Sequence, residues 1–144
     1  MPIDERYDEL ADADWDAFAR SWLEELQDPT FDPDDDSDSW SERVLIMNLL
    51  ARPELQWRFI LKAIALADSD DALGHIAAGP LEHLLGLHGE TFIAQVEERA
   101  VIDPKFARTL TGMWRHVMSD SIWARVQALQ ARVSNPLPPD GTVN

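Results

Sequence analysis

The sequence contains no cysteine. This absence excludes disulfide bonds, cysteine-ligated zinc, iron–sulfur clusters and a thiol nucleophile. The N-terminus reads Met-Pro-Ile-Asp-Glu-Arg and lacks the basic stretch and apolar run of a signal peptide. No stretch approaches the roughly 18 uninterrupted apolar residues that a membrane-spanning helix needs. We therefore expect a cytoplasmic protein.

Strand patterns are also missing, because no segment alternates apolar and polar residues with β-branched enrichment. Apolar residues recur instead at helical spacing, and 45% of the 144 residues are hydrophobic, enough to form one core. The sequence predicts an all-α fold, a single compact bundle or short helical-hairpin stack of about eight short helices. We expect one helical domain over 14–134, between a mobile acidic segment at 1–13 and a mobile proline-rich tail at 135–144.

The first helix is expected at about 14–27, where apolar residues from Trp15 to Leu26 form one stripe. Two prolines and a run of aspartates make 28–39 a solvated acidic loop. Residues 41–50 are apolar on most sides, which predicts a short central helix. Pro53 is suited to the first position of a helix through about Ala67.

Capping and helix-breaking residues divide the rest of the chain into further short helices. One of these helices should carry Met113, Trp114 and Val117 on its inward stripe, so Trp114 is expected in the core. The predicted boundaries are Ser69, Gly79-Pro80, Gly89, Asp103-Pro104, and Ser119 or Asp120.

The stretch from Gly79 to Gly89 reads Gly-Pro-Leu-Glu-x-Leu-Leu-x-x-His-Gly. Together with Phe92-Ile93, Asp103-Pro104 and Trp114, it resembles a family of small bacterial proteins of unknown function with this core motif. The resemblance covers roughly residues 55–116 and implies a helical fold. It implies no activity and no catalytic residue, and the acidic N-terminal third lies outside it.

The chain has few basic residues where its acids are densest. Residues 1–42 hold 16 Asp or Glu against Arg6 and Arg20, so they account for −14 of the net charge of −15. Such a field repels nucleic acids and anionic membranes and speeds encounter with a basic protein surface. We therefore expect a basic protein partner, with no direct nucleic-acid binding and no membrane binding; the oligomeric state stays open.

The acidic loop is the candidate partner-binding site, with Trp40 either a lid over the core or an exposed aromatic anchor. A calcium site fits less well, because a loop counted from Asp32 has Ser37 at position six and Arg43 at position twelve, where Gly and Glu are needed. No metal or cofactor is expected. The predicted partner-binding residues are Asp28, Asp32, Asp34, Asp35, Asp36, Asp38, Trp40 and Glu42.

A second candidate site lies near His75, His83, His88 and Glu82, but its spacing matches no metal motif and supplies no catalytic partner. We interpret Glu82 as a first-turn carboxylate that accepts from free helical N–H groups, and His88 as a helix C-terminal residue. Glu97 is expected to pair with Arg99 and Arg115.

Three hypotheses of function follow. The first is a non-enzymatic binding protein, such as an immunity-type or nucleic-acid-mimicking inhibitor of a basic protein. The second is an uncharacterised helical scaffold whose acidity serves solubility. The third is a small-ligand or enzyme site near Glu82 and His83.

Overall fold

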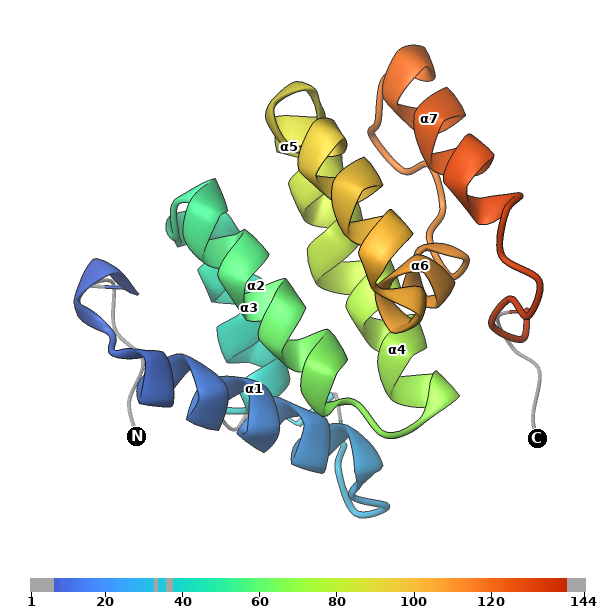
Figure 1. Ribbon diagram of the computed structural model, residues 1–144. Helices are drawn as coiled ribbons and strands as arrows, with labels where there is room; N and C mark the ends of the chain where they lie inside the picture. The colour runs from blue at the N-terminus through green and yellow to red at the C-terminus, as the bar shows by residue number, and fades with distance from the viewer. Residues whose placement is uncertain (1–6, 33, 36–37, 140–144) are drawn as a thin grey trace. The chain divides into compact units, whose positions relative to one another are not determined.

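The fold is all-α, as the periodicity predicts. The computed structural model describes residues 7–32, 34–35 and 38–139, which form seven α-helices, one 3-10 turn and one π-helical turn, without a strand (Figure 1). The expected count of about eight helices was slightly high. The chain divides into two compact units, residues 1–67 and 68–144, which are described separately below. The single domain over 14–134 stays a prediction.

Unit 1 contains η1 (Tyr7–Glu9), α1 (Asp12–Gln27), α2 (Trp40–Leu50) and α3 (Pro53–Leu66). Helix α1 packs against both α2 and α3. The predicted stripes are confirmed, because Trp15, Phe18 and Phe59 are fully buried, and the rings of Phe18 and Phe59 lie 4.9 Å apart. Burial of such aromatic side chains is the main source of stability in a small helical unit.

Local sequence chemistry fixes the helix ends in unit 1. At the start of α1, an Asp14 carboxylate oxygen accepts the backbone N–H of Ala11 at 3.0 Å, so Asp14 binds the cap position from the first turn rather than occupying it. Pro53 occupies the first turn of α3, as predicted, where its missing N–H costs no helical hydrogen bond.

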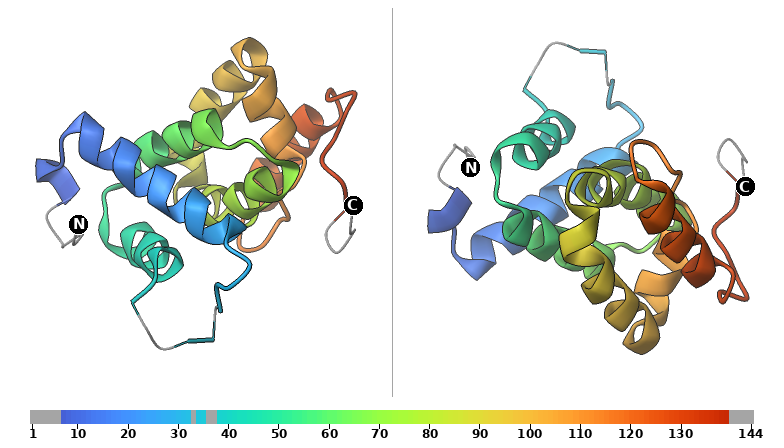
Figure 2. Two further views of the ribbon diagram at one scale, coloured as in Figure 1. Left: turned by 90° about the horizontal axis from the view of Figure 1, so that it is seen from below. Right: turned by 90° about the horizontal axis from the view of Figure 1, so that it is seen from above.

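The expectation that residues 41–50 form a central helix was wrong. Only Val44, Met47 and Asn48 of α2 are buried. The opposite face is exposed although it is apolar, and we call it the α2 outer face: Leu45, Ile46, Leu49 and Leu50. Both views of Figure 2 place α2 at the edge of unit 1, next to the loop that joins it to α1.

Unit 2 begins with α4 (Asp70–Ile76), η2 (Ala77–Leu81) and α5 (Glu82–Ile102). Gly79-Pro80 was expected to end a helix, but the chain stays helical there. The backbone widens into a π-helical turn, in which the Glu82 N–H reaches the Ala77 carbonyl, and such a turn accommodates the proline that a regular α-helix would reject.

The helix boundary expected at Gly89 is confirmed. The segment α5 consists of two helical parts that meet at His88, which takes the non-helical angles φ −130° and ψ 26°. His88 therefore lies at the C-terminal end of the first part, as predicted, and the second part runs on to Ile102. Gly89 is buried, and a Cβ there would meet Ile122 of α7 at 3.0 Å, so this glycine allows close packing of α5 and α7.

The last helices are α6 (Pro104–Leu110) and α7 (Asp120–Gln130). Both predicted starts are confirmed: an Asp103 carboxylate oxygen accepts the Phe106 N–H at 3.1 Å, and Ser119 Oγ accepts the Ile122 N–H at 3.3 Å. Trp114 was wrongly placed in the core. Helix α6 ends at Leu110, so the helical spacing no longer applies at Trp114, which is 65% exposed.

The described part of the C-terminal tail, residues 135–139, is held against unit 2. The Leu137 side chain is buried, and its N–H donates to Thr111 Oγ1 at 2.8 Å. Arg108 Nε donates to the Asn135 carbonyl at 2.7 Å. Mobility of the tail and of residues 1–13 stays a prediction, and residues 1–6 and 140–144 lie outside the described part.

Candidate functional site: the acidic loop

The acidic loop, residues 28–39, is tied at its base by Glu25 in the last turn of α1. The two Glu25 carboxylate oxygens accept the N–H groups of Trp40 and Ser41 at 2.9 and 2.8 Å, and the Ser41 hydroxyl at 2.8 Å. Ser39 Oγ accepts the Glu42 N–H at 3.0 Å. These bonds satisfy N–H groups at the start of α2 that have no helical acceptor. The end of α1 and the start of α2 are therefore fixed together across the loop.

Two aspartates turn the backbone inside the loop. Asp28 Oδ1 accepts from the Thr30 N–H at 2.9 Å and from its hydroxyl at 2.7 Å, which holds the pKa of Asp28 below its usual value. Asp32 Oδ1 accepts the Asp34 N–H at 2.9 Å. Bonds from an aspartate to the N–H two residues on are typical of turns. Both side chains stay exposed.

Asp38, Arg43 and Trp40 form a cluster at the end of the loop. Arg43 pairs with Asp38 through two hydrogen bonds, and this partner holds the pKa of Asp38 below its usual value. The Arg43 guanidinium lies 4.6 Å above the Trp40 ring, and the centroid of that ring lies 5.8 Å from the centroid of the Phe18 ring. Trp40 is half-buried and covers the aromatic core, which favours the lid over the exposed anchor.

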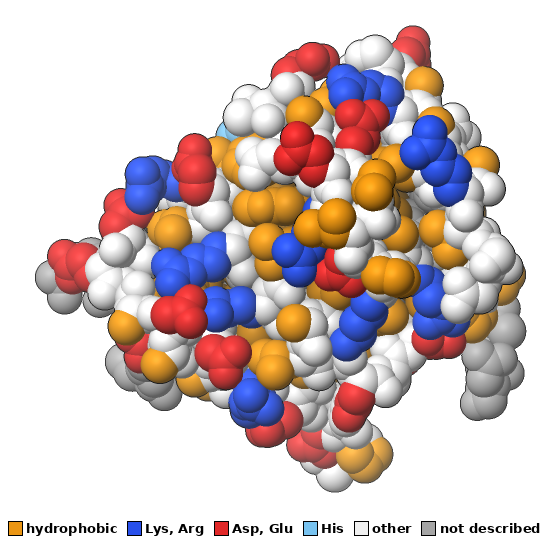
Figure 3. Space-filling view, in the orientation of Figure 1, with side chains coloured by type: hydrophobic (Ala, Val, Ile, Leu, Met, Phe, Trp, Pro, Cys, Tyr) orange, Lys and Arg blue, Asp and Glu red, His pale blue; other side chains and the backbone are white. Residues whose placement is uncertain are grey.

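Elsewhere in unit 1, many acidic side chains already have basic partners. Asp12 contacts both Arg58 and Lys62 of α3, at 2.6 and 2.9 Å, and this pairing lowers the pKa of Asp12. Red and blue side chains are interspersed over this face in Figure 3. The other ion pairs of this kind are Asp8–Arg52 and Asp16–Arg20.

The acids of the loop and its borders differ from these paired acids. Exposed carboxylates without an ion pair gather at the loop, where the described residues include Glu24, Asp28, Asp32, Asp34 and Glu42; Glu54, Glu90 and Glu98 are further exposed acids of this kind, but they lie singly on other helices. Asp35 is exposed as well, and Asp36 lies outside the described residues. Of the predicted partner-binding residues, Asp38 and Trp40 already contact other residues of unit 1, namely Arg43 and Phe18.

For the described residues of the two candidate regions, a metal site would require several ligand side chains placed close together. In the described part of the chain, no group of three or more His, Asp or Glu side chains is placed to hold a metal ion. His75 is exposed and lies 3.6 Å from Asp71 in the same helix.

No helix of the described residues has the length and apolar character needed to cross a membrane.

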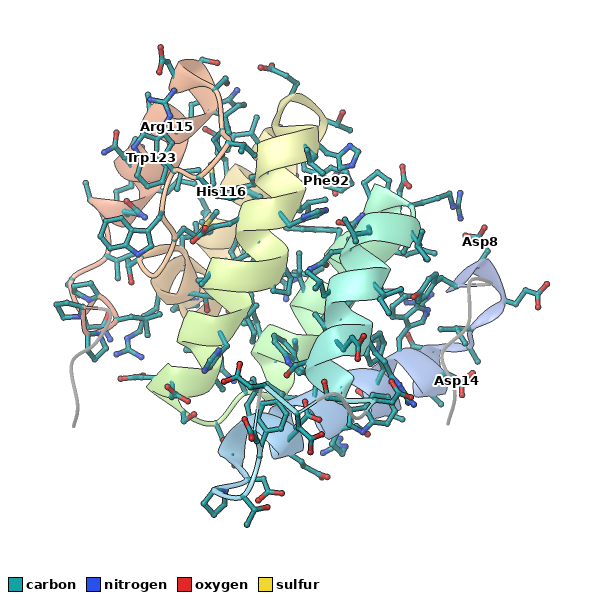
Figure 4. The ribbon with its side chains drawn as sticks, turned by 180° about the vertical axis from the view of Figure 1, so that it is seen from behind. Asp8, Asp14, Phe92, Arg115, His116 and Trp123 are labelled. Carbon is teal, nitrogen blue, oxygen red and sulfur yellow. The ribbon has the colours of Figure 1, made fainter. Side chains whose placement is uncertain are left out.

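Glu82 is buried, but its partner was not foreseen. Because the helix continues through Gly79-Pro80, Glu82 has no free N–H groups of its own helix to bind, and it accepts the Trp114 N–H at 2.9 Å instead. Burial raises the pKa of Glu82, although this hydrogen bond and the nearby His116 oppose the rise. His116 lies on the segment between α6 and α7 (Figure 4) and has a positive φ of 49°.

The expected pairing of Glu97 with Arg99 and Arg115 was wrong. Glu97 pairs with Arg125 of α7, and this partner lowers the pKa of Glu97. Arg99 pairs with Asp103 four residues later, and Arg115 pairs with Asp120. The prediction considered residues near Glu97 in the sequence, whereas Arg125 is distant in the sequence and comes close because α7 packs beside α5.

Sequence reasoning missed two features of the site. The Glu25 carboxylate is far from Trp40 and Ser41 in sequence, so no local pattern indicates this bond. The α2 outer face was interpreted as core, although a signal existed: a helix of eleven residues bordered by an aspartate-rich loop is badly placed to be buried on all sides.

Comparison with known proteins gives one match. The model of a family of unknown function (DUF6869) matches residues 28–134, a wider span than the resemblance at 55–116, and one that includes the acidic loop and α2. No curated protein and no solved structure matches.

Proposed function

The chain belongs to this family of unknown function, and we propose that it is a non-enzymatic binding protein that neutralises a basic protein surface through the acidic loop. The observation that carries the proposal is the separation of the acids into two groups. The acids of η1 and α1 largely serve ion pairs and caps inside unit 1, whereas Asp28, Asp32, Asp34 and Glu42 are exposed without an ion pair in the described residues.

Unpaired, exposed carboxylates repel one another and lower the stability of the folded chain. A basic partner removes that repulsion and is attracted over a distance, so its association is fast at low salt. The Glu25 bonds fix the base of the loop, which reduces the entropy lost when a partner binds. Immunity proteins and nucleic-acid-mimicking inhibitors act in this way, and we propose this class for the chain.

The proposal is tested by affinity capture from the host, at low and at high salt. The test variant is Asp28→Asn, Asp32→Asn, Asp34→Asn and Asp35→Asn, because an Asn side-chain oxygen can still accept the turn hydrogen bonds of Asp28 and Asp32. The matched control changes four exposed acids outside the N-terminal third: Glu54→Gln, Asp71→Asn, Glu90→Gln and Glu98→Gln.

We expect a basic protein to bind the wild type and the control at low salt, and to bind the loop variant poorly. High salt should release it. Capture of the same partners by the loop variant and the wild type would contradict the proposal, and would favour the scaffold hypothesis, in which acidity serves only solubility.

A further inference from the structure

The α2 outer face is a strip of large aliphatic side chains in water. Leu45, Ile46, Leu49 and Leu50 are 58%, 38%, 66% and 54% exposed. They lie one turn apart in pairs, at positions i, i+1, i+4 and i+5, so they form one continuous surface along the helix. Single exposed apolar residues are ordinary on protein surfaces, whereas a contiguous strip marks an interaction site.

The residues that border this strip are negatively charged. Glu42 is exposed in the first turn of α2 and lies three and four residues before Leu45 and Ile46, on the same side of the helix. The acidic loop directly precedes that turn. Arg43 is the basic residue of α2, and its charge is paired with Asp38.

Two kinds of occupant could cover an apolar strip on a helix: a second copy of the chain or a different protein. Two copies meeting at α2 would bring together two copies of unit 1, each with a net charge of −11. Repulsion between them would oppose this contact. A partner with basic side chains beside its own apolar stripe complements both the strip and its border.

We propose that the α2 outer face docks an amphipathic helix of the partner, whose leucine-like stripe covers Leu45, Ile46, Leu49 and Leu50 and whose flanking Lys or Arg side chains meet Glu42 and the described acids of the loop. This inference rests on the proposed function and names the form of the basic partner. Apolar contacts with the strip should provide binding affinity that does not depend on salt. The charges of the loop should raise the association rate and orient the partner, and salt should weaken both effects.

The test uses three synthetic peptides of about 18 residues, a length of roughly five helical turns. The first has leucines at helical spacing and lysines elsewhere. The second has the same composition in scrambled order, without an apolar face. The third keeps the leucines and replaces each lysine by glutamate. Binding to the full-length chain is measured by fluorescence anisotropy at low and high salt.

The variant of the strip is Leu45→Ser with Leu49→Ser, and its matched control is Val101→Ser with Ile102→Ser, which changes two residues of unit 2 that are 75% and 73% exposed. We expect the amphipathic basic peptide to bind the wild type best, and the strip variant to bind it roughly tenfold or more weakly at both salt concentrations. The control should bind like the wild type. Circular dichroism checks that both variants keep the wild-type helix content.

The results separate the docking proposal from the function on which it rests. Equal, salt-sensitive binding of the basic and scrambled peptides would overturn docking and leave the acidic binding function standing. Binding that the strip variant leaves unchanged would overturn docking on α2. No binding of either basic peptide would overturn both. A wild-type dimer in analytical ultracentrifugation that the strip variant loses would assign the face to a second copy and overturn the proposal.

Discussion

The Glu82 carboxylate accepts the backbone N–H of Trp114 at 2.9 Å, and so holds the segment after α6 against α5. Glu82 is 8% exposed, and burial raises its pKa above the ordinary value of 4.5. A buried carboxylate costs stability when it is charged, but the Trp114 N–H would lose its partner without it. Glu82 is therefore explained as a structural residue of unit 2.

Replacing Glu82 by Gln should stabilise the chain increasingly as the pH rises. Since the folded pKa of Glu82 is raised, the stability it contributes is fully present below the unfolded pKa and is lost as the pH rises through the folded pKa. Gln does not titrate and still accepts from the Trp114 N–H. The free energy of unfolding of Glu82→Gln, minus that of the wild type, should rise as the pH increases above the ordinary pKa of a glutamate, and should level off above the raised pKa of folded Glu82.

Urea unfolding at several pH values measures this difference. Glu98→Gln, at an exposed position of α5, is the control for the loss of one exposed charge. A difference for Glu82→Gln that does not change with pH would mean that the Glu82 carboxylate is solvated.

Leu85 and Trp114 should respond very differently to alanine. Leu85 is 1% exposed, so Leu85→Ala opens a cavity and should lower the free energy of unfolding by about 2–5 kcal/mol. Trp114 is 65% exposed, so Trp114→Ala should cost less than about 1 kcal/mol. Denaturant titration of both variants tests this contrast. Equal losses would mean that Trp114 is packed against the rest of the protein.

Gly86 tests how closely the segment after α6 approaches α5. A Cβ at Gly86 would lie 2.6 Å from Val117 Cγ2, so Gly86→Ala must displace that side chain. In a Val117→Ala background the obstacle is gone, and the same change should stabilise α5 by up to about 1 kcal/mol through helix propensity. The double-mutant cycle should therefore show coupling between the two sites. Additive effects would contradict the close approach.

Sequence patterns predicted the parts of the fold that local chemistry determines. The stripe of α1, Pro53 at the start of α3 and the caps at Asp103 and Ser119 each depend on residues within one or two turns. The errors arose where distant packing decides the outcome. Trp114 fits a helical spacing that stops at Leu110, and the turn that keeps Pro80 inside a helix has no signal in the sequence itself.

The candidate site shows the same division. Its charge could be counted from the sequence, and the aspartates at 28 and 32 are typical turn residues. Which acids are paired could not be predicted, because Asp12 meets its partners across two helices. The exposure of the α2 outer face depends on which side of α2 packs against α1 and α3, and helical spacing alone does not say how much of a wide apolar face is covered.

Arg108 should limit the access of solvent to the backbone of tail residues 135–139. It donates to the Asn135 carbonyl and also pairs with Asp70. Arg108→Ala removes both contacts, so the amide of Leu137 should exchange with solvent faster in hydrogen-exchange measurements. Arg125→Ala removes a different ion pair of unit 2, with Glu97, and should leave exchange at Leu137 unchanged. Unchanged exchange in both variants would mean that Leu137 and Thr111 suffice to hold the tail.

The salt dependence of the association rate tests the central claim most directly. The amphipathic lysine peptide is mixed with the wild type, the Asp28, Asp32, Asp34 and Asp35 to Asn variant, and the Glu54, Asp71, Glu90 and Glu98 control in a stopped-flow instrument. Wild type and control should associate fast at low salt, the loop variant several-fold more slowly, and the three rates should converge as salt screens the charges. If the loop variant associates at the wild-type rate in low salt, the acidic loop does not recruit a basic partner.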